Sequence, residues 1–230
     1  MGIKDIFSLR FREILSLIIS LPITVYVNFR CLPFKTAIKL PIFIGHKTRI
    51  GKLSRIITFG CKPTTFMVRI GWGGTESREE GRKNYLFLNK NASLKFNGKC
   101  TISSGVSLVL DLGHLEIGDN FFCNKNCSFS CNDRITIGDN ALFGWNIELL
   151  DSDNHKVIHK TEKNISDRGE IKIGNHVWVA AYSHILKNSA IPDVSVVAYR
   201  SLVTKQFHGE KLLIGGSPAK VIEEEIEWEQ

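Results

Sequence analysis

Residues 173–203 read IGNHVWVAAYSHILKNSAIPDVSVVAYRSLV, and this stretch decides the fold. A β-branched aliphatic residue recurs at every sixth position: Ile173, Val179, Ile185, Ile191, Val197 and Val203. A period of six fits neither an α-helix, with about 3.6 residues per turn, nor an ordinary half-buried strand, with a period of two. It fits a chain that turns a corner after each short strand and points one large apolar side chain inward per side. Three such sides make a coil of about 18 residues, and successive coils stack as parallel strands.

The same pattern extends towards the N-terminus. Ile137 and Ile117 each begin an Ile-Gly-Asp-Asn motif that resembles the Ile-Gly-Asn-His at Ile173. Gly, Asn and Asp tolerate the backbone conformations that the corners need. A weaker series of inward positions is Leu88, Leu94, Cys100, Val106 and Leu112. The sequence therefore predicts a mainly β protein with a parallel β-helix over residues 39–207.

Two stretches interrupt the repeat. Residues 151–170, DSDNHKVIHKTEKNISDRGE, are polar and lack the aliphatic step, so they predict a loop extruded from a corner. Residues 60–87 predict a second excursion or an irregular early coil. Loops on a rigid scaffold are common places for binding and catalytic residues.

The two ends differ from the coil. Residues 1–38 form an apolar segment with basic flanks, in which we expect a helix to about Leu21 that breaks at Pro22. This helix either lies on a membrane surface, through residues 1–30, or covers the open end of the β-helix. Residues 208–230 form a C-terminal extension with an acidic end, from which no function follows.

Composition excludes several classes of protein. Apolar residues make up 43% of the chain, which is enough for a continuous core and argues against disorder. The formal net charge of +7 suits anionic partners, but the chain has no nucleic-acid motif, so a phosphate-bearing ligand or a membrane is favoured. We identify no secretory signal, and the six cysteines contain no CxxC pair, which favours a reducing cytoplasm. Cys123, Cys127 and Cys131 are interpreted as small buried residues of the coil rather than metal ligands.

The stretch from Ile137 to Ile222 resembles the hexapeptide-repeat O-acetyltransferases, especially the maltose, galactoside and capsule or lipopolysaccharide sugar enzymes. The matching motifs are DSDNH at 151–155, IGNHVW at 173–178, SLVTK at 201–205 and GSPAKVI at 216–222. The resemblance implies a left-handed β-helix, acetyl-CoA as the acyl donor without a metal, and a homotrimer with its active sites between subunits. It also implies a sugar or lipid-linked sugar acceptor, modified during surface polysaccharide biosynthesis.

By this resemblance His155 is the general base that deprotonates the acceptor. An imidazole titrates near neutral pH, which independently suits that role. Asp153 and Asp151 are close enough in sequence to orient the other ring nitrogen of His155. Asn124 matches an asparagine beside the acceptor, although it is equally interpretable as a corner residue of the coil.

The resemblance also assigns residues to the donor. Trp178 matches a tryptophan beside the pantetheine channel, but a core or subunit-contact residue is an open alternative. The remaining matched positions are Ala180, Ala181, Tyr199, Thr204, Lys205 and Lys220. Tyr199 replaces a small residue of the family pattern, so it narrows or redirects the channel if it faces coenzyme A.

Other functions stay open at this stage. N-acetylation of an amino sugar uses the same base. A zinc enzyme of the γ-carbonic-anhydrase kind would need three histidines that meet between subunits, drawn from His155, His159, His176 and His184. A non-catalytic scaffold would not need His155. We expect the protein in the cytoplasm, at the inner face of the membrane.

Overall fold

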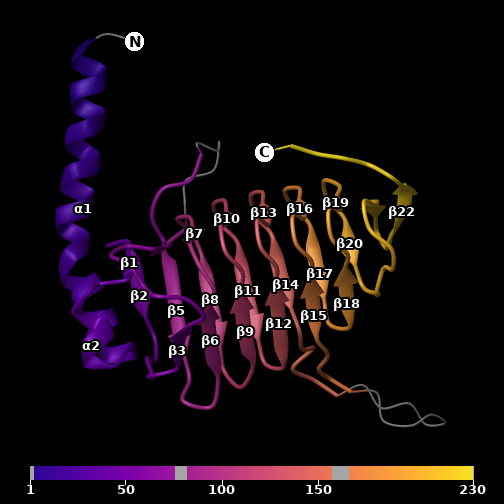
Figure 1. Ribbon diagram of the computed structural model, residues 1–230, viewed down its shortest axis with the longest axis horizontal. Coiled ribbons are helices and arrows are strands. Elements are labelled where there is room, and N and C mark those ends of the chain that lie inside the picture. The colour runs from indigo at the N-terminus through magenta and orange to yellow at the C-terminus, as the bar shows by residue number, and fades with distance from the viewer. Residues whose placement is uncertain (1–2, 76–81, 157–165, 230) are drawn as a thin grey trace.

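The computed structural model describes residues 3–75, 82–156 and 166–229, which form a β-helix with one long helix across its N-terminal end (Figure 1). The first helices are α1 (Ile3–Cys31) and α2 (Phe34–Ala37). The strands belong to three sheets that form the sides of the coil, which we name sheets A, B and C. All strand pairs are parallel except the last one in sheet A. The predicted left-handed parallel β-helix is therefore confirmed.

The strands of each sheet are given in the order in which they are hydrogen-bonded. Sheet A consists of β1 (Ile42–Ile44), β4 (Val68–Ile70), β7 (Cys100–Ile102), β10 (Phe121–Cys123), β13 (Leu142–Phe143), β16 (Trp178–Val179), β19 (Val196–Val197), β21 (Leu213–Gly216) and β22 (Ala219–Glu223). Sheet B consists of β2 (Thr48–Ile50), β5 (Asn84–Leu88), β8 (Ser107–Leu110), β11 (Ser128–Cys131), β14 (Glu148–Leu150), β17 (His184–Leu186) and β20 (Leu202–Val203). Sheet C consists of β18 (Ser189–Ile191), β15 (Ile171–Ile173), β12 (Arg134–Ile137), β9 (His114–Ile117), β6 (Ser93–Phe96) and β3 (Ile57–Phe59).

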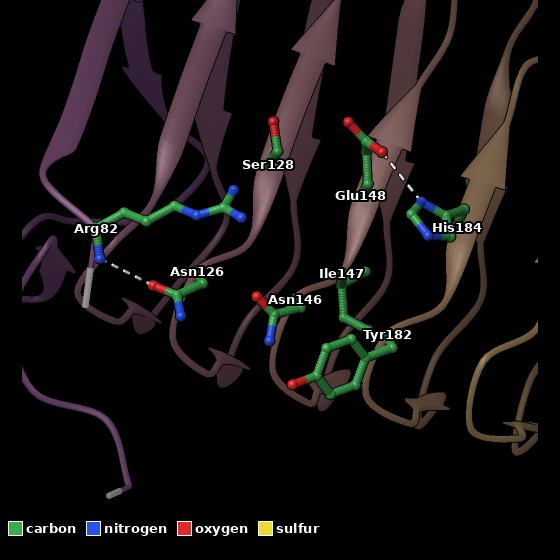
Figure 2. A pocket seen from close by; sticks show the side chains of 8 residues that line it. All are labelled: Arg82, Asn126, Ser128, Asn146, Ile147, Glu148, Tyr182 and His184. Atoms are coloured by element: carbon green, nitrogen blue, oxygen red, sulfur yellow. Dashed lines mark hydrogen bonds and ion pairs between the residues drawn. The ribbon is translucent and has the colours of Figure 1, made fainter. Parts of the chain in front are cut away.

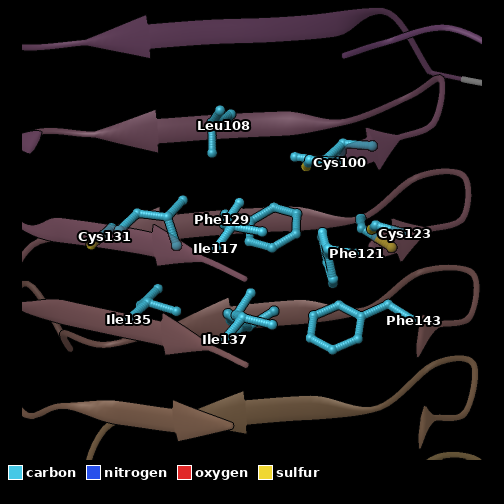
Figure 3. Close-up of a cluster of buried hydrophobic side chains, with 14 of the residues drawn as sticks. Cys100, Leu108, Ile117, Phe121, Cys123, Phe129, Cys131, Ile135, Ile137 and Phe143 are labelled. Carbon is cyan, nitrogen blue, oxygen red and sulfur yellow. The ribbon is translucent and has the colours of Figure 1, made fainter. Parts of the chain in front are cut away.

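The core lies inside the coil and consists of the inward side chains of all three sheets (Figure 3). All six residues of the repeat from Ile173 to Val203 are buried, as predicted. Phe129 is fully buried, with its ring stacked on that of Phe143 at a centroid distance of 6.3 Å. Cys123, Cys127 and Cys131 are buried free thiols, which confirms their interpretation as core residues.

One inward position was predicted wrongly. Leu112 is 37% exposed, because sheet B points Leu108 and Leu110 inward and the chain then turns before Leu115 becomes the next inward residue. Leu94 pairs with Leu115 on the next coil, so this coil has 115 − 94 = 21 residues rather than about 18, and the six-residue step loses its register at this corner.

The predicted break of the N-terminal helix at Pro22 is also wrong, because α1 continues to Cys31. Three polar side chains of α1, Ser20, Thr24 and Asn28, are fully buried and bond to the free edge of β1. The Asn28 amide donates to the carbonyl of Ile42 at 2.6 Å and accepts its N–H at 3.2 Å. These bonds hold the helix on both sides of Pro22, so tertiary contacts override the missing N–H of the proline.

The opposite face of α1 is apolar and faces away from the coil. Its residues, each 40–57% exposed, are Ile14, Leu15, Ile18, Ile19, Leu21, Val25, Tyr26 and Phe29. We call these residues the outer face of α1. The window Ile14–Cys31 has a mean hydropathy of 1.7, so by length and composition alone it could cross a membrane, and 28% of it is buried in the protein.

Candidate functional site

The turns between sheets A and B form a continuous column along the coil, which we call the A–B corner. It consists of residues 103–106, 124–127, 144–147, 180–183 and 198–201. Each turn contains a residue with positive φ, which bends the chain sharply. In the first turns this residue is Gly105, Asn126 or Asn146, which tolerate the conformation.

The last two turns of the A–B corner place larger residues in the same conformation. Tyr182 has φ 62° and Arg200 has φ 58°. The left-handed region costs a non-glycine residue roughly 1–2 kcal/mol, and such strain collects at functional sites. The Tyr182 and Tyr199 rings meet edge to face at 5.5 Å, and the Arg200 guanidinium lies 5.6 Å and 5.3 Å from their centroids. Sequence reasoning singled out Tyr199 but missed Tyr182. In the structure Tyr182 and Arg200 take the places of the corner asparagines of earlier coils.

Two buried polar atoms without a partner lie at the A–B corner: the indole Nε1 of Trp145 and the hydroxyl of Ser103. Among the residues that the structure describes, these are the only buried side-chain polar atoms of this kind. Because an unsatisfied buried donor costs about 1–3 kcal/mol, such atoms are expected to bond to a ligand or a neighbouring subunit. The A–B corner therefore has the chemistry of a binding site.

A pocket of about 280 Å³ adjoins this corner on the outer face of sheet B (Figure 2). It is lined by Arg82, Asn126, Ser128, Asn146, Ile147, Glu148, Tyr182 and His184. Figure 2 shows Asn126, Asn146 and Tyr182 in a row along the corner. On the adjacent strands His184 Nδ1 lies 3.0 Å from the Glu148 carboxylate. We call this cavity the sheet B pocket; the sequence offered no signal that joined these two residues.

The predicted loop leaves the coil at the opposite edge of sheet B, between β14 and β15 (Figure 1). Its base is a narrow neck, in which Ser152 forms a β-bridge with Arg168 and the Asp153 N–H donates to the Asp167 carbonyl at 2.8 Å. Lys187, after β17, closes the neck: its ammonium lies 2.6 Å from the Asp153 carboxylate and donates to the Ser166 carbonyl at 2.8 Å.

His155 lies just beyond this neck with an exposed side chain. Neither aspartate expected to orient it contacts its ring. Asp153 pairs with Lys187, while the Asp151 carboxylate accepts the backbone N–H groups of Asn132 and Asp133 at 2.7 and 2.8 Å. Burial raises the pKa of Asp151, and these two hydrogen bonds oppose the rise. Both aspartates therefore position the loop, because their oxygens are used to hold its base.

Asn124 bonds to the N-terminal excursion. Its amide donates to the Thr75 hydroxyl at 2.7 Å and accepts the Thr75 N–H at 3.2 Å. The next corner residue, Asn126, accepts the N–H of Arg82 at 3.1 Å. Thr75 and Arg82 of the 71–83 excursion are thus both hydrogen-bonded to the A–B corner. Asn124 therefore has a structural role here, and its expected contact with the acceptor remains a prediction.

The residues assigned to the donor, Trp178 apart, fall into three places. Ala180, Ala181 and Tyr199 lie together at the A–B corner. Lys220 in β22 pairs with Gly215 of β21, and the carbonyl of the preceding residue of β21 accepts the N–H of Ala198 at that corner at 2.7 Å. Thr204 and Lys205, in contrast, follow β20 at the far edge of sheet B.

Trp178 is 38% exposed on the outer face of sheet A. Its ring lies 6.0 Å from that of Trp228, which also stacks on His176 at 4.1 Å. Trp228 of the C-terminal extension therefore packs against His176 and lies beside Trp178, an arrangement that the sequence did not predict.

In the described part of the chain no group of three His, Cys, Asp or Glu side chains could hold a metal ion. His176 stacks on Trp228 and His184 pairs with Glu148. His159, the fourth histidine considered for zinc, lies outside the described residues.

Comparisons with known proteins find similarity to acetyltransferases. No family model matches the chain. It is 35% identical to the galactoside O-acetyltransferase of Escherichia coli over 116 residues, 48% of this chain and 54% of the relative. It is 26% identical to an uncharacterised 24.8 kDa protein in the capsule region of Klebsiella pneumoniae over 204 residues, 88% of each chain.

Among solved structures, a hexapeptide-repeat acetyltransferase from Vibrio cholerae complexed with acetyl-coenzyme A matches with a TM-score of 0.45 and 25% identity. That match covers 52% of this chain and 64% of the other. The chain spans about half the length of the curated relatives that it matches. The first curated relatives of this chain are thus named as acetyltransferases.

Proposed function

We propose that the protein transfers an acetyl group from acetyl-CoA to a sugar hydroxyl in surface polysaccharide biosynthesis. The observation that carries this proposal is the pairing of two features on one β-helix. The DSDNH motif places His155 on an extruded loop, and the small residues Ala180 and Ala181 line a corner that also holds the unsatisfied Trp145 indole. The similarity to a galactoside O-acetyltransferase and to a capsule-region protein supports the substrate class.

In the proposed reaction His155 accepts the proton of the acceptor hydroxyl while the hydroxyl oxygen attacks the thioester carbonyl carbon. The new C–O bond forms and the C–S bond breaks, so the acetyl group moves to the sugar. The imidazolium then returns its proton to the departing thiolate, which leaves as coenzyme A and restores neutral His155. The Ala180–Ala181 turn offers no side-chain bulk, so an extended pantetheine arm fits along the A–B corner.

A homotrimer completes the proposed site. His155 lies at one edge of sheet B, whereas Ala180, Ala181 and Tyr199 lie at the other edge. Thr204 and Lys205 are on the His155 side, so one chain separates its own base from most of its donor residues. A neighbouring subunit in a closed ring would bring its loop to the corner of this one.

The test measures coenzyme A release from acetyl-CoA with a panel of sugars, amino sugars and their nucleotide- and lipid-linked forms. Because Cys61 is an exposed thiol, the assay with a thiol reagent uses a Cys61→Ser background. We expect acceptor-dependent release that falls at least ~10²-fold in His155→Ala, the scale for loss of a general base. His208→Ala, another exposed histidine, is the matched control.

Release of coenzyme A with amino sugars alone would mean that the reaction is N-acetylation rather than O-acetylation. If no acceptor gives release and calorimetry detects no acetyl-CoA binding, the transferase proposal fails.

We also propose that the outer face of α1 lies on the inner surface of the cytoplasmic membrane. Between Ile14 and Phe29 all side chains with hydroxyl or amide groups, Tyr26 apart, follow one four-residue step: Ser16, Ser20, Thr24 and Asn28. This polar stripe faces the coil. Because residues 14–29 include no charged residue, the outward face carries no charge. Exposed Arg30, Lys35 and Lys39 flank it, which suits anionic lipid headgroups.

A second copy of the chain packed in parallel fits the outer face less well, because exposed Arg30, Lys35 and Lys39 lie together beyond its C-terminal end. Two such helices side by side would bring these like charges together. Co-sedimentation with phosphatidylglycerol vesicles tests the proposal. We expect binding that falls in an Ile18→Ser/Val25→Ser variant. Unchanged vesicle binding with an altered oligomeric mass would assign this face to another subunit.

A further inference from the structure

A second pocket, of about 330 Å³, lies where α1, the 71–83 excursion and the A–B corner meet. Lys47, Arg82 and Lys125 line it together with His46, and no carboxylate is among its lining residues. None of the three cations forms an ion pair with a described residue. Among the described residues the lining of this cavity therefore carries positive charge and no negative charge, which favours binding of an anion. We call this cavity the basic pocket.

The fold holds the three cations from separate coils. Lys47 lies between β1 and β2, Lys125 follows β10, and Arg82 precedes β5. The backbone N–H of Arg82 donates to Asn126, and that of Lys125 donates to the Asn124 side chain at 2.9 Å. These bonds fix the backbone of Arg82 and of Lys125 at the corner, and so fix where the two side chains begin.

α1 forms one wall of the basic pocket. Ser16 lines it, and His46 Nδ1 lies 3.4 Å from the hydroxyls of both Ser16 and Ser20. The same turn of α1 carries Ile14, Leu15 and Ile18 on its outer face. The basic pocket thus lies immediately behind the surface that we assign to lipid.

Arg82 lines both the basic pocket and the sheet B pocket (Figure 2), so the two cavities adjoin. The donor residues are farther along the same corner. Four coil steps of ~4.8 Å separate Gly71, beside the basic pocket, from Ala180, which is roughly 19 Å. The basic pocket therefore lies on the side of the sheet B pocket away from the predicted donor.

We infer that the basic pocket binds a phosphate or diphosphate group of the acceptor, and that the adjoining sheet B pocket receives its sugar. This inference rests on the proposed acetyltransferase function and names its acceptor class as a phosphate-linked sugar. Guanidinium and ammonium groups are the usual phosphate ligands in proteins. The phosphate has two chemical sources, a lipid diphosphate that enters from the outer face of α1 and a soluble nucleotide diphosphate.

The first test measures pyrophosphate binding to the full chain by calorimetry, without acetyl-CoA and therefore without turnover. We expect saturable binding that weakens at least ~10-fold in Lys47→Ala and in Lys125→Ala, the loss for one charge-assisted hydrogen bond. Lys90→Ala, an exposed lysine at another corner, should bind like the parent. Absence of saturable binding, or equal weakening in Lys90→Ala, would overturn the inference.

Coenzyme A also carries phosphates, so the same titration is repeated with saturating coenzyme A. Pyrophosphate should still bind, because the donor residues lie elsewhere on the corner. Competitive displacement would assign the basic pocket to the donor and overturn the acceptor assignment.

The second test compares acetyl transfer to one sugar in four forms: free, as its 1-phosphate, nucleotide diphosphate-linked, and polyprenyl diphosphate-linked in vesicles. We expect the phosphate-bearing forms to have the higher kcat/KM, with Lys125→Ala removing the advantage. A higher rate for the vesicle form identifies the lipid source, and a higher rate for the nucleotide form identifies the soluble one. Equal kcat/KM for all four forms contradicts the inference but leaves the transferase intact, whereas pyrophosphate binding without any transfer contradicts the transferase alone.

Discussion

The coil and the helix α1 that closes its N-terminal end differ in the side chains that they bury. The coil buries apolar residues such as Phe129 and exposes charged ones, including the Lys95–Glu116 ion pair at 2.8 Å on sheet C. α1 buries the polar Ser20, Thr24 and Asn28 as well as Val27 and Cys31, and it exposes an apolar face. The difference follows from what each surface meets: the interior of the coil needs only packing, whereas the edge of β1 needs hydrogen-bond partners.

An edge strand presents a row of unpaired N–H and carbonyl groups. α1 satisfies them with side chains spaced by one helical turn: the Thr24 hydroxyl accepts the Ile44 N–H at 3.0 Å, and the Ser20 hydroxyl accepts that of His46 at 3.0 Å. A polar stripe at four-residue spacing therefore serves as a substitute strand. An apolar stripe on a helix does not by itself identify the face that contacts the protein.

The largest effect on stability is expected inside the coil. Phe129→Ala should lower the free energy of unfolding by about 3–5 kcal/mol, because the fully buried ring stacks on Phe143 and its loss leaves a cavity. Denaturant unfolding followed by circular dichroism measures the change. Phe122→Ala, whose half-buried ring lies on the outer face of sheet A, is the control and should cost less. Equal costs would mean that inward and outward positions of the coil are not distinct.

At the end cap the expected loss comes from a polar side chain. Asn28→Ala leaves the N–H and carbonyl of Ile42 unpaired in a buried place, which should cost about 2–3 kcal/mol. The opening is local, so we expect faster labelling of Cys31, whose buried thiol has its pKa raised to about 11, while Cys131 in the coil stays protected. Phe29→Ala, on the outer face of α1, is the control. Equal acceleration at both thiols would show that the cap and the coil open together.

The extruded loop differs from both the coil and the end cap. We expect its ion pair between Lys187 and Asp153 to matter more for catalysis than for the stability of the fold. Lys187→Ala should lower kcat for acetyl transfer roughly 10-fold, equivalent to about 1.4 kcal/mol, by loosening the neck that carries His155. The KM for acetyl-CoA should stay unchanged and Lys187→Arg should restore most of the rate. A higher KM for acetyl-CoA with unchanged kcat would instead indicate that Lys187 contributes to binding of the acyl donor.

The smallest effect on folding is expected on the outer face of α1. Ile18→Ser/Val25→Ser should change the free energy of unfolding by less than about 1 kcal/mol, because both side chains are exposed in the folded protein. The same variant should lose vesicle binding. A large loss of stability in solution would mean that this face is buried against another subunit.

The six-residue repeat was sufficient to predict the coil, because each inward aliphatic residue marks one short strand on one of the three sides of the coil. The polar stretch that interrupts the repeat likewise predicted that His155 lies on a loop, whereas the structure showed that Ala180 and Ala181 lie at a corner. Leu112 shows the limit of the pattern: where a coil is longer than about 18 residues, as between the paired Leu94 and Leu115, the six-residue step no longer identifies the inward side chain.

The sequence by itself determined the architecture and indicated the reaction class that we propose, since periodicity and motif order are local properties of the chain. Only the tertiary structure decided which face of α1 contacts the coil and that the helix continues through Pro22. It decided as well which residues Asp153 and Asn124 bond to. It also brought Lys47, Arg82 and Lys125 into one pocket. Those outcomes depend on groups that are distant in sequence and become neighbours only when the coils stack, so the linear pattern does not contain them.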